Sequence, residues 1–408
     1  MSQAKDGLSD TIVSIELYWI SLPFDAARRS QEDSNAESID AFNASSRTLT
    51  QMESLMVKVQ TADGFTGWGE AFGHKSNPAT WAALEQIVAP FFLGRSSALD
   101  GSIASAEYAF HAFGRTGPIH FALSAVDIAL WDIAARRAGQ TLREFINIDA
   151  RHEINAYASL VHYAEDPQEV AFHLSRALEH GFKAFKIHES SIPAIKAARQ
   201  AVGSHPLMVD VNCKWHHPAE AGSSIAAMAD LELLWIEEPI FPPDDSQSLA
   251  ALNARFGNVS GGENHSGVQG LTSDMELGAL QFAQPSVGKI GGLSAMLKIR
   301  EAGQRLNVHV VPHCFYYGPA LLATAQLIAA DQEVQLANGS LRPELEIPFL
   351  GWETQLHPWH APHQGKLTNE GTIRLPTEAG LGFTPDPVVL ENHALKHLVL
   401  TTAPCEGK

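Results

Sequence analysis

Short apolar runs and longer amphipathic stretches alternate along the chain from residue 153 onwards. Eight runs are apolar over only a few residues, as buried strands are: 154–160, 182–188, 207–212, 233–239, 258–264, 280–286, 308–313 and 334–338. Between them the spacing of apolar positions predicts helices at 167–180, 191–202, 245–256, 291–305 and 318–330. Strands that alternate with helices are parallel, because parallel neighbours need a crossover. Eight units within roughly 185 residues favour a closed barrel.

The open, doubly wound sheet is the alternative arrangement of such units. That fold normally carries a glycine-rich phosphate turn after its first strand. The segment after 154–160 reads VHYAEDP and contains no glycine. We therefore predict the barrel.

The first 150 residues show a different pattern. Residues 11–22 predict a strand, and 54–60 and 65–70 predict a hairpin around the turn at 62–64. Helical patterns follow at 79–90, 100–113 and 118–138, and the last is apolar nearly all round and stops at Gly139. Residues 24–48 are polar and predict a long loop. We expect a capping α+β domain at 1–150, the barrel at 151–348, and a C-terminal segment at 349–408 that returns to the cap.

Composition excludes several functional classes. The formal net charge is −18, which argues against nucleic acid as a partner, since phosphate binding needs clustered Lys and Arg. The three cysteines are far apart and form no CxxC pair, so neither a disulfide framework nor a structural zinc site is expected. We find no signal-peptide core and no run of about 18 apolar residues. A cytoplasmic protein without membrane contact is the resulting prediction.

Three acidic residues stand at the C-terminal ends of consecutive predicted strands. They are Asp210, Glu237 and Glu263, which lie 27 and 26 residues apart. The C-terminal ends of neighbouring barrel strands face one mouth, so these carboxylates should converge. Singly, each could be a helix cap or surface charge, but three ionised carboxylates in one dry pocket require a cation. Mg²⁺ is the usual hard cation for such oxygen ligands. Of Glu237 and Glu238, only one can face the ion.

Three candidate bases stand near the same strand ends. Lys186 and His188 are two residues apart and therefore share one face of the second strand, while His313 ends the seventh. A substrate carboxylate held by the metal would then have a base on either side. Removal of the weakly acidic proton next to a carboxylate needs this arrangement, together with cations that stabilise the resulting enediolate.

These motifs together resemble the enolase superfamily, in particular its mandelate racemase/muconate lactonizing enzyme branch. The resemblance covers nearly the whole chain, in order and at matching spacing: GWGE at 67–70, GFKAFKIH at 181–188, VDVN at 209–212, WIEEP at 235–239, GGEN at 261–264, AQPSVGKIGG at 283–292, VPHCF at 311–315 and GLGFTPDP at 380–387. It implies an α/β fold with a modified TIM barrel, (β/α)₇β, a cap formed by both chain ends, bound Mg²⁺ and an enediolate intermediate. The implied metal ligands are Asp210, Glu237 and Glu263. Asn212, Asn264 and Ser286 are the candidate substrate contacts.

The chain departs from the branch at three places. The usual Lys-x-Lys of the second strand is Lys186-Ile187-His188. Ser286 stands where an Asp usually orients the histidine of the seventh strand, so His313 lacks the carboxylate that would fix its tautomer. The eighth strand, expected at 334–338, has Ala337 or Asn338 where racemase-like members have a Glu. We interpret Lys289 as structural.

We therefore predict a metal-dependent lyase that dehydrates an acid sugar. His188 or Lys186 removes the proton, and His313 protonates the departing hydroxyl. The alternatives are a racemase or epimerase and, in another class, a metal-binding barrel that has lost efficient catalysis. The expected partners are a small carboxylate substrate and further copies of the chain.

Overall fold

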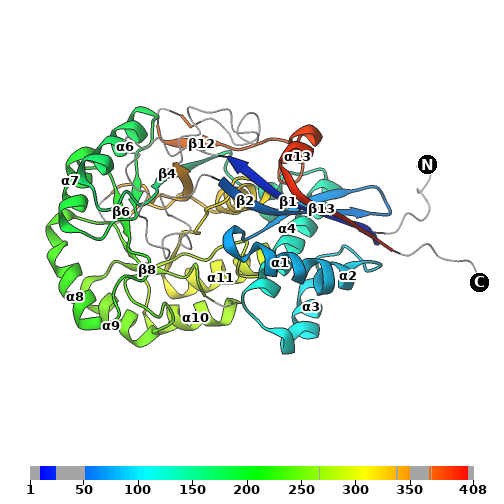
Figure 1. The fold of residues 1–408 in the computed structure, drawn as a ribbon, viewed down its shortest axis with the longest axis horizontal. Helices are drawn as coiled ribbons and strands as arrows, with labels where there is room; N and C mark the ends of the chain where they lie inside the picture. The colour runs from blue at the N-terminus through cyan, green and yellow to red at the C-terminus, as the bar shows by residue number, and fades with distance from the viewer. Residues whose placement is uncertain are drawn as a thin grey trace, which may run out of the picture.

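The computed structural model describes residues 10–23, 51–265, 267–336, 339–349, 367–368 and 370–402. A barrel of parallel strands wrapped by helices lies beside a smaller cap of antiparallel strands and helices (Figure 1). The first and last strands of the described chain, β1 (Ile12–Pro23) and β13 (Ala394–Thr401), lie side by side in the cap. The loop expected at 24–48 and the residues Ala337 and Asn338 lie outside the described part of the chain.

The barrel has the predicted alternation of strand and helix. Its parallel strands run in the order β10-β9-β8-β7-β6-β5-β4-β11, and β12 (Thr372–Arg374) adds to β4 in antiparallel fashion. The strands are β4 (Glu153–Leu160), β5 (Phe185–Ile187), β6 (Leu207–Asp210), β7 (Ile236–Glu237), β8 (Val259–Gly261), β9 (Phe282–Ala283), β10 (His309–Val310) and β11 (Leu345–Phe349). The intervening helices are α6 (Pro167–Glu179), α7 (Ile192–Val202), α8 (Pro218–Ala227), α9 (Ser246–Phe256), α10 (Gly267–Leu277), α11 (Gly292–Leu306) and α12 (Pro319–Ala329). The predicted (β/α)₇β fold is confirmed.

The predicted position of the eighth strand is wrong. The strand that pairs with β4 is β11, with Leu345 opposite Ala156 and Phe349 opposite Leu160. Gln335, in the run that we expected to be the strand, forms only an isolated bridge with Leu341. Both runs, 334–338 and 345–349, are short and largely apolar. Which of them becomes the eighth strand depends on pairing with β4, which lies far away in the sequence.

Large apolar side chains fill the interior of the barrel below its mouth. Tyr157, Met208, Trp235 and Phe282 form one buried cluster. Because side chains alternate along a strand, Met208 lies on the same side of its strand as Asp210, two residues further on. Trp235 stands in the same relation to Glu237, and its Nε1 donates a hydrogen bond of 3.2 Å to Glu237 Oε2. The polar mouth therefore rests on an apolar floor.

The cap is built on a four-stranded antiparallel sheet in the order β13-β1-β2-β3. Its strands are β1 (Ile12–Pro23), β2 (Gln51–Thr61), β3 (Thr66–Ala71) and β13 (Ala394–Thr401). Its helical segments are α1 (Asn77–Ala83), the π-helical turn Leu84–Val88, α2 (Ala89–Phe92), α3 (Ser102–Phe110), α4 (Pro118–Ala138) and α5 (Leu142–Ile146), with 3₁₀ turns at His74–Ser76 and His111–Phe113. The predicted hairpin and the buried helix ending at Gly139 are confirmed.

Helix α4 packs directly on β3. A Cβ atom at Gly67 would lie 2.1 Å from the carbonyl oxygen of Ala129, and one at Gly69 would lie 1.8 Å from that of Ala125. Only glycine permits this approach, which explains the Gly-Trp-Gly part of the GWGE motif. Helix α4 is also the one described helix that is long and apolar enough to cross a membrane, and most of it is buried inside the protein.

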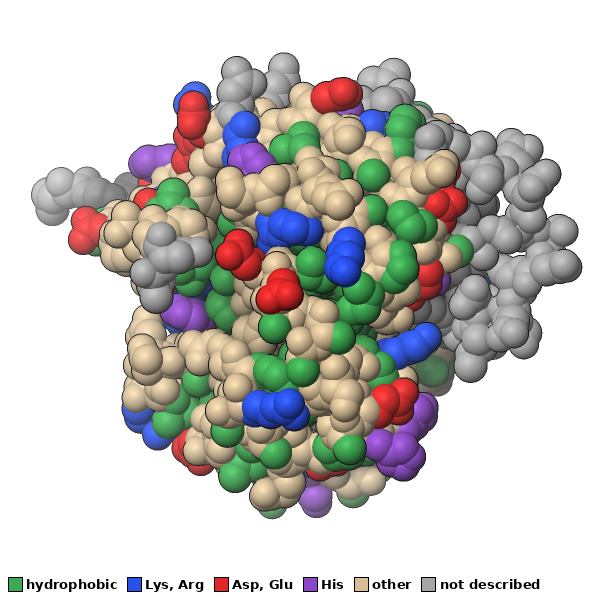
Figure 2. Space-filling model, turned by 90° about the vertical axis from the view of Figure 1, so that its left-hand side faces the viewer, with side chains coloured by type: hydrophobic (Ala, Val, Ile, Leu, Met, Phe, Trp, Pro, Cys, Tyr) green, Lys and Arg blue, Asp and Glu red, His purple; other side chains and the backbone are tan. Residues whose placement is uncertain are grey.

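The C-terminal segment contacts the cap. Strand β13 pairs with β1 over Ser14–Ile20, next to α13 (Pro387–His393). Upstream of α13, the amide of Leu381 donates to Asp132 of α4 at 2.8 Å. The domain limits at 150 and 348 stay a prediction, and the second falls inside β11. On the barrel face shown in Figure 2, acidic and basic side chains are interspersed among neutral ones.

Candidate active site

Three carboxylates meet at the mouth of the barrel. Asp210 and Glu237 are the last residues of β6 and β7 and lie opposite each other in the parallel ladder. Glu263 follows β8 in the next loop. One carboxylate oxygen from each of the three lies within 4.8 Å of the others. The structure thus brings together the three residues that the spacing of the strands singled out.

Lys186 lies in the middle of these carboxylates and is completely buried. Its Nζ is 3.1 Å from Glu237 Oε2, 3.6 Å from Asp210 Oδ2 and 2.8 Å from Glu346 Oε1. Burial alone would lower the pKa of Lys186, but the charges of Glu237 and Glu346 outweigh it and raise the pKa well above its ordinary value. Lys186 is therefore held as a cation.

His188 is fixed by the backbone of the neighbouring strand. Its Nδ1 makes a short hydrogen bond with the carbonyl oxygen of Leu160, at the end of β4. A carbonyl oxygen only accepts, so Nδ1 carries the proton and donates it. The other ring nitrogen, Nε2, lies 3.3 Å from Asp210 Oδ2 and thus faces the carboxylates.

His313 approaches the same cluster from β10. Its Nε2 is 3.0 Å from Glu263 Oε2, while its Nδ1 is buried without a hydrogen-bond partner among the described residues. Burial lowers the pKa of His313, although Glu263 opposes the shift. Ser286, at the position of the usual Asp, is completely buried and its hydroxyl hydrogen-bonds to Tyr316.

Glu238 and the two asparagines surround the metal candidates. Burial and the charges of Glu263 and Asp210 raise the pKa of Glu238 to about 8. The side-chain amide of Asn264 donates to Glu238 at 2.9 Å, and that of Asn212 donates to Asp210 at 2.9 Å. Both asparagines therefore lie beside the carboxylates, and their role as substrate contacts stays a prediction.

Two charged side chains at the site were missed in the sequence. Glu346 of β11 takes the place that we expected Ala337 or Asn338 to fill, and it also accepts from the amide of Cys314 at 2.8 Å. Lys289, interpreted as structural, lies 3.3 Å from Glu263 and 4.0 Å from the ring centroid of Phe72 of the cap. A glutamate inside the alternating run at 345–349 was the available signal for the first, whereas Lys289 had none.

His74 is a third group that sequence reasoning missed, and it comes from the cap. Burial, together with the positive charges of Lys289 and His313, lowers its pKa to about 3. Its ring lies 5.9 Å from that of Phe315, in the loop after β10. The cap therefore places a neutral imidazole next to the charged residues of the barrel.

The donor set fits a hard divalent cation. Five carboxylates at the mouth face two lysines, Lys186 and Lys289: Asp210, Glu237, Glu238, Glu263 and Glu346. Burial raises the pKa of Glu237 well above its ordinary value, and Asp210 and Glu346 add to the shift. All-oxygen ligands with surplus negative charge are what Mg²⁺ prefers. Asp210, Glu237 and Glu263 are the residues placed to hold it.

These features define a class of protein. A (β/α)₇β barrel with a carboxylate triad at its mouth, a lysine and histidine on one side and a histidine on the other is suited to metal-assisted proton removal next to a carboxylate.

Known proteins match both parts of the chain. Residues 169–389 match the family described as enolase C-terminal domain-like, and residues 32–147 match the mandelate racemase / muconate lactonizing enzyme N-terminal domain. The chain belongs to the mandelate racemase/muconate lactonizing enzyme branch of the enolase superfamily.

Individual relatives are similar over most of the chain. D-galactarolactone cycloisomerase of Agrobacterium fabrum is 28% identical over 84% of this chain and 91% of its own length. L-talarate/galactarate dehydratase of Salmonella typhimurium is 27% identical over 65% of this chain and 69% of its own. The structure of L-talarate/galactarate dehydratase from S. typhimurium LT2, liganded with Mg and L-lyxarohydroxamate, superposes with a TM-score of 0.78 at 23% identity, and covers 99% of this chain and 97% of that one.

Proposed function

We propose that the protein is a Mg²⁺-dependent dehydratase of an acid sugar. One observation carries the proposal: every candidate acid–base group touches the carboxylate triad. His188 lies against Asp210, Lys186 against both Asp210 and Glu237, and His313 against Glu263. A substrate carboxylate placed at the triad therefore has proton-transfer groups on both sides.

His188 is the group best placed to take the proton. Because its Nδ1 donates to Leu160, the lone pair of the neutral ring is on Nε2, which faces the triad. Lys186 contacts three carboxylates, so it serves as a fixed positive charge beside the substrate carboxylate. When bound at the triad, Mg²⁺ stabilises the negative charge that develops on the substrate carboxylate as the proton leaves.

His313 supplies the proton for the second half of the reaction. Burial alone would raise the pKa of Glu263, but the positive charges of His313 and Lys289 outweigh it and lower the pKa. Glu263 is therefore an ionised carboxylate, which only accepts hydrogen bonds. His313 Nε2 therefore carries the proton in its contact with Glu263. His313 acts as the acid in its imidazolium form, which the charge of Glu263 favours. As the bond from the β-carbon to its hydroxyl breaks, the leaving oxygen takes the Nε2 proton and departs as water, and a neutral ring remains. The remaining enol becomes the 2-keto acid.

The relatives support both the chemistry and the substrate class. A talarate/galactarate dehydratase is among them, and so is a galactarolactone cycloisomerase that matches over 91% of its own length. Cycloisomerisation is therefore the second candidate. It begins with the same proton removal, but the leaving oxygen belongs to a ring, so no water is lost. Racemisation stays the alternative in which His313 returns the proton to the same carbon.

One experiment separates these reactions. The Mg²⁺-loaded protein is incubated in D₂O with acid sugars and their lactones, and the products are followed by proton NMR and mass spectrometry. After the mass of incorporated deuterium is subtracted, dehydration gives a 2-keto product lighter by one water and cycloisomerisation gives an isomer of the substrate. Both carry deuterium at the β-carbon, whereas racemisation gives deuterium at the α-carbon alone. No exchange and no product with any compound would contradict the proposal and favour a binding protein. A homo-oligomeric state and a cytoplasmic location stay predictions.

A further inference from the structure

The loops that follow β4 and β5 are joined by two reciprocal carboxylate contacts. Glu189, after β5, accepts from the amides of Tyr163 at 2.5 Å and Glu165 at 2.8 Å, both after β4. In return, Glu165 accepts from the amides of Ser190 at 3.0 Å and Ser191 at 2.8 Å. Each loop therefore supplies a side chain that binds the backbone of the other.

The loop after β4 needs this support because its backbone is strained. Ala164 and Glu165 have φ values of 58° and 60°, which residues with a side chain rarely adopt, and here two occur in succession. Such conformations persist only where surrounding contacts impose them. The amide of Glu165, one of the strained residues, is held directly by Glu189.

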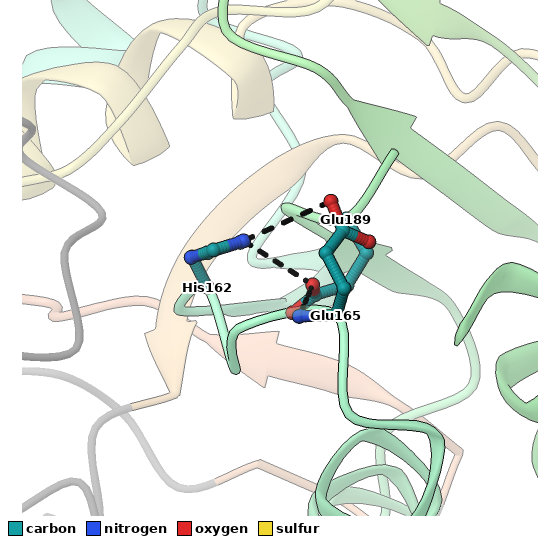
Figure 3. Close-up of side chains that lie close together, drawn as sticks. All are labelled: His162, Glu165 and Glu189. Carbon is teal, nitrogen blue, oxygen red and sulfur yellow. Dashed lines mark hydrogen bonds and ion pairs between the residues drawn. The ribbon is translucent and has the colours of Figure 1, made fainter. Parts of the chain in front are cut away.

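The ring of His162 points towards both carboxylates (Figure 3). Its Nε2 is 3.4 Å from Glu189 Oε2 and 3.9 Å from Glu165 Oε1. Glu189 is almost completely buried, and burial raises its pKa to about 7, although His162 opposes the shift. The imidazole thus offsets part of the cost of placing two carboxylates side by side.

This cluster adjoins the candidate base. Glu189 is the residue after His188, and the carbonyl that accepts from His188 Nδ1 belongs to Leu160, two residues before His162. The direction of the His188 ring therefore depends on how the two loops lie relative to each other. We propose that Glu165 and Glu189 are positioning residues that hold His188 Nε2 towards the carboxylate triad.

This role rests on the proposed function, since it concerns the base of that reaction. It does not require a metal in the cluster, because backbone amides already occupy both oxygens of each carboxylate. A second metal site is nevertheless the competing explanation for a histidine and two glutamates at this spacing. The number of divalent metal ions bound by the wild type and by Glu189→Gln decides between the two explanations.

The test compares Glu189→Gln and Glu165→Gln with Glu16→Gln, which alters a carboxylate paired with Lys58 in the capping sheet. In protein with nitrogen-labelled histidine, the Nδ1–H resonance of His188 is identified by its loss in His188→Asn. We expect it to exchange faster with water, or to disappear, in the two positioning variants. With an acid-sugar substrate, kcat should fall by about 10- to 100-fold, while KM and the Kd for Mg²⁺ change by less than about 3-fold. Glu16→Gln should match the wild type in each measurement.

Three results would count against the proposal or limit it. An unchanged ring resonance, with an unchanged kcat, in a folded Glu189→Gln protein would overturn it. Wild-type protein that binds a second equivalent of divalent metal, lost in Glu189→Gln, would overturn it in favour of a metal site. If the wild type converts no acid sugar, the proposed function fails, but the ring resonance still decides whether the glutamates position His188. Glu165 is partly exposed, so its variant carries the test if Glu189→Gln does not fold.

Discussion

Glu70 connects the cap to the barrel through a buried carboxylate. It lies near the end of β3 and accepts from Ser54 Oγ at 2.5 Å and from the amide of Ala320, in the first turn of α12, at 3.0 Å. Its exposed fraction is 3%, and burial raises its pKa from 4.5 to about 7 despite these hydrogen bonds. Ionisation of Glu70 therefore costs free energy in the native protein that it does not cost in the unfolded chain.

The sign and size of the effect follow from this shift. Between pH 4.5 and about 7, the native protein retains a proton that the unfolded chain has released. The free energy of unfolding therefore falls as the pH rises through this range. For a shift of this size, the loss between about pH 5 and about pH 8 is about 2.5 kcal/mol from this one group.

Glu70→Gln tests this directly. The glutamine oxygen still accepts from Ala320, and its amide group donates to the Ser54 hydroxyl, which rotates to accept. In urea denaturation, the stability of the variant relative to the wild type should increase by about 2.5 kcal/mol from about pH 5 to about pH 8. Other groups with raised pKa values, such as Asp127, titrate in both proteins and cancel.

The control is Glu301→Gln, at an exposed position on α11, whose difference from the wild type should be the same at both pH values. A difference for Glu70→Gln that also stays constant between the two pH values would refute the reasoning. Burial of this carboxylate would then carry no ionisation cost.

Three further predictions concern the site. Chelation should abolish activity and Mg²⁺ should restore it, whereas full turnover in excess chelator would contradict metal dependence. Glu263→Gln should weaken Mg²⁺ binding in calorimetric titration, because one anionic ligand is lost. His313→Asn should stop water loss but leave α-proton exchange in D₂O, measured by NMR, whereas Lys186→Met and His188→Asn should reduce both. Loss of exchange in a folded His313 variant that binds Mg²⁺ would show that His313 is the initiating base. Glu346→Gln should lower kcat about 10²-fold, since Lys186 loses a charged partner. Circular dichroism should show the fold of this variant intact, and an unchanged kcat would show that Glu346 takes no part.

Local pattern was sufficient for most of the barrel. Seven of the eight predicted strands were found because each is a short apolar run. The five helices predicted in the barrel were placed to within about a residue, whereas α8 and α10 were not predicted. The eighth was misplaced to 334–338 because two apolar runs follow α12. The choice depended on pairing with β4, and no local signal reports such a contact.

The central residues of the active site could also be predicted from local pattern. Asp210, Glu237, Glu263, Lys186 and His313 could be singled out because strand ends of a closed barrel must share one mouth, so spacing along the chain becomes proximity in space. The sequence by itself thus determined the fold class and the central charges.

Only the tertiary structure decided what surrounds those charges. Glu346 was missed with its strand, and His74 reaches the site from the cap. The contacts of Glu165 and Glu189 depend on a loop backbone with positive φ that no residue type in the segment announces. Periodicity encodes which face of an element is buried, whereas the neighbours of a loop side chain are set by the packing of segments far apart in the chain.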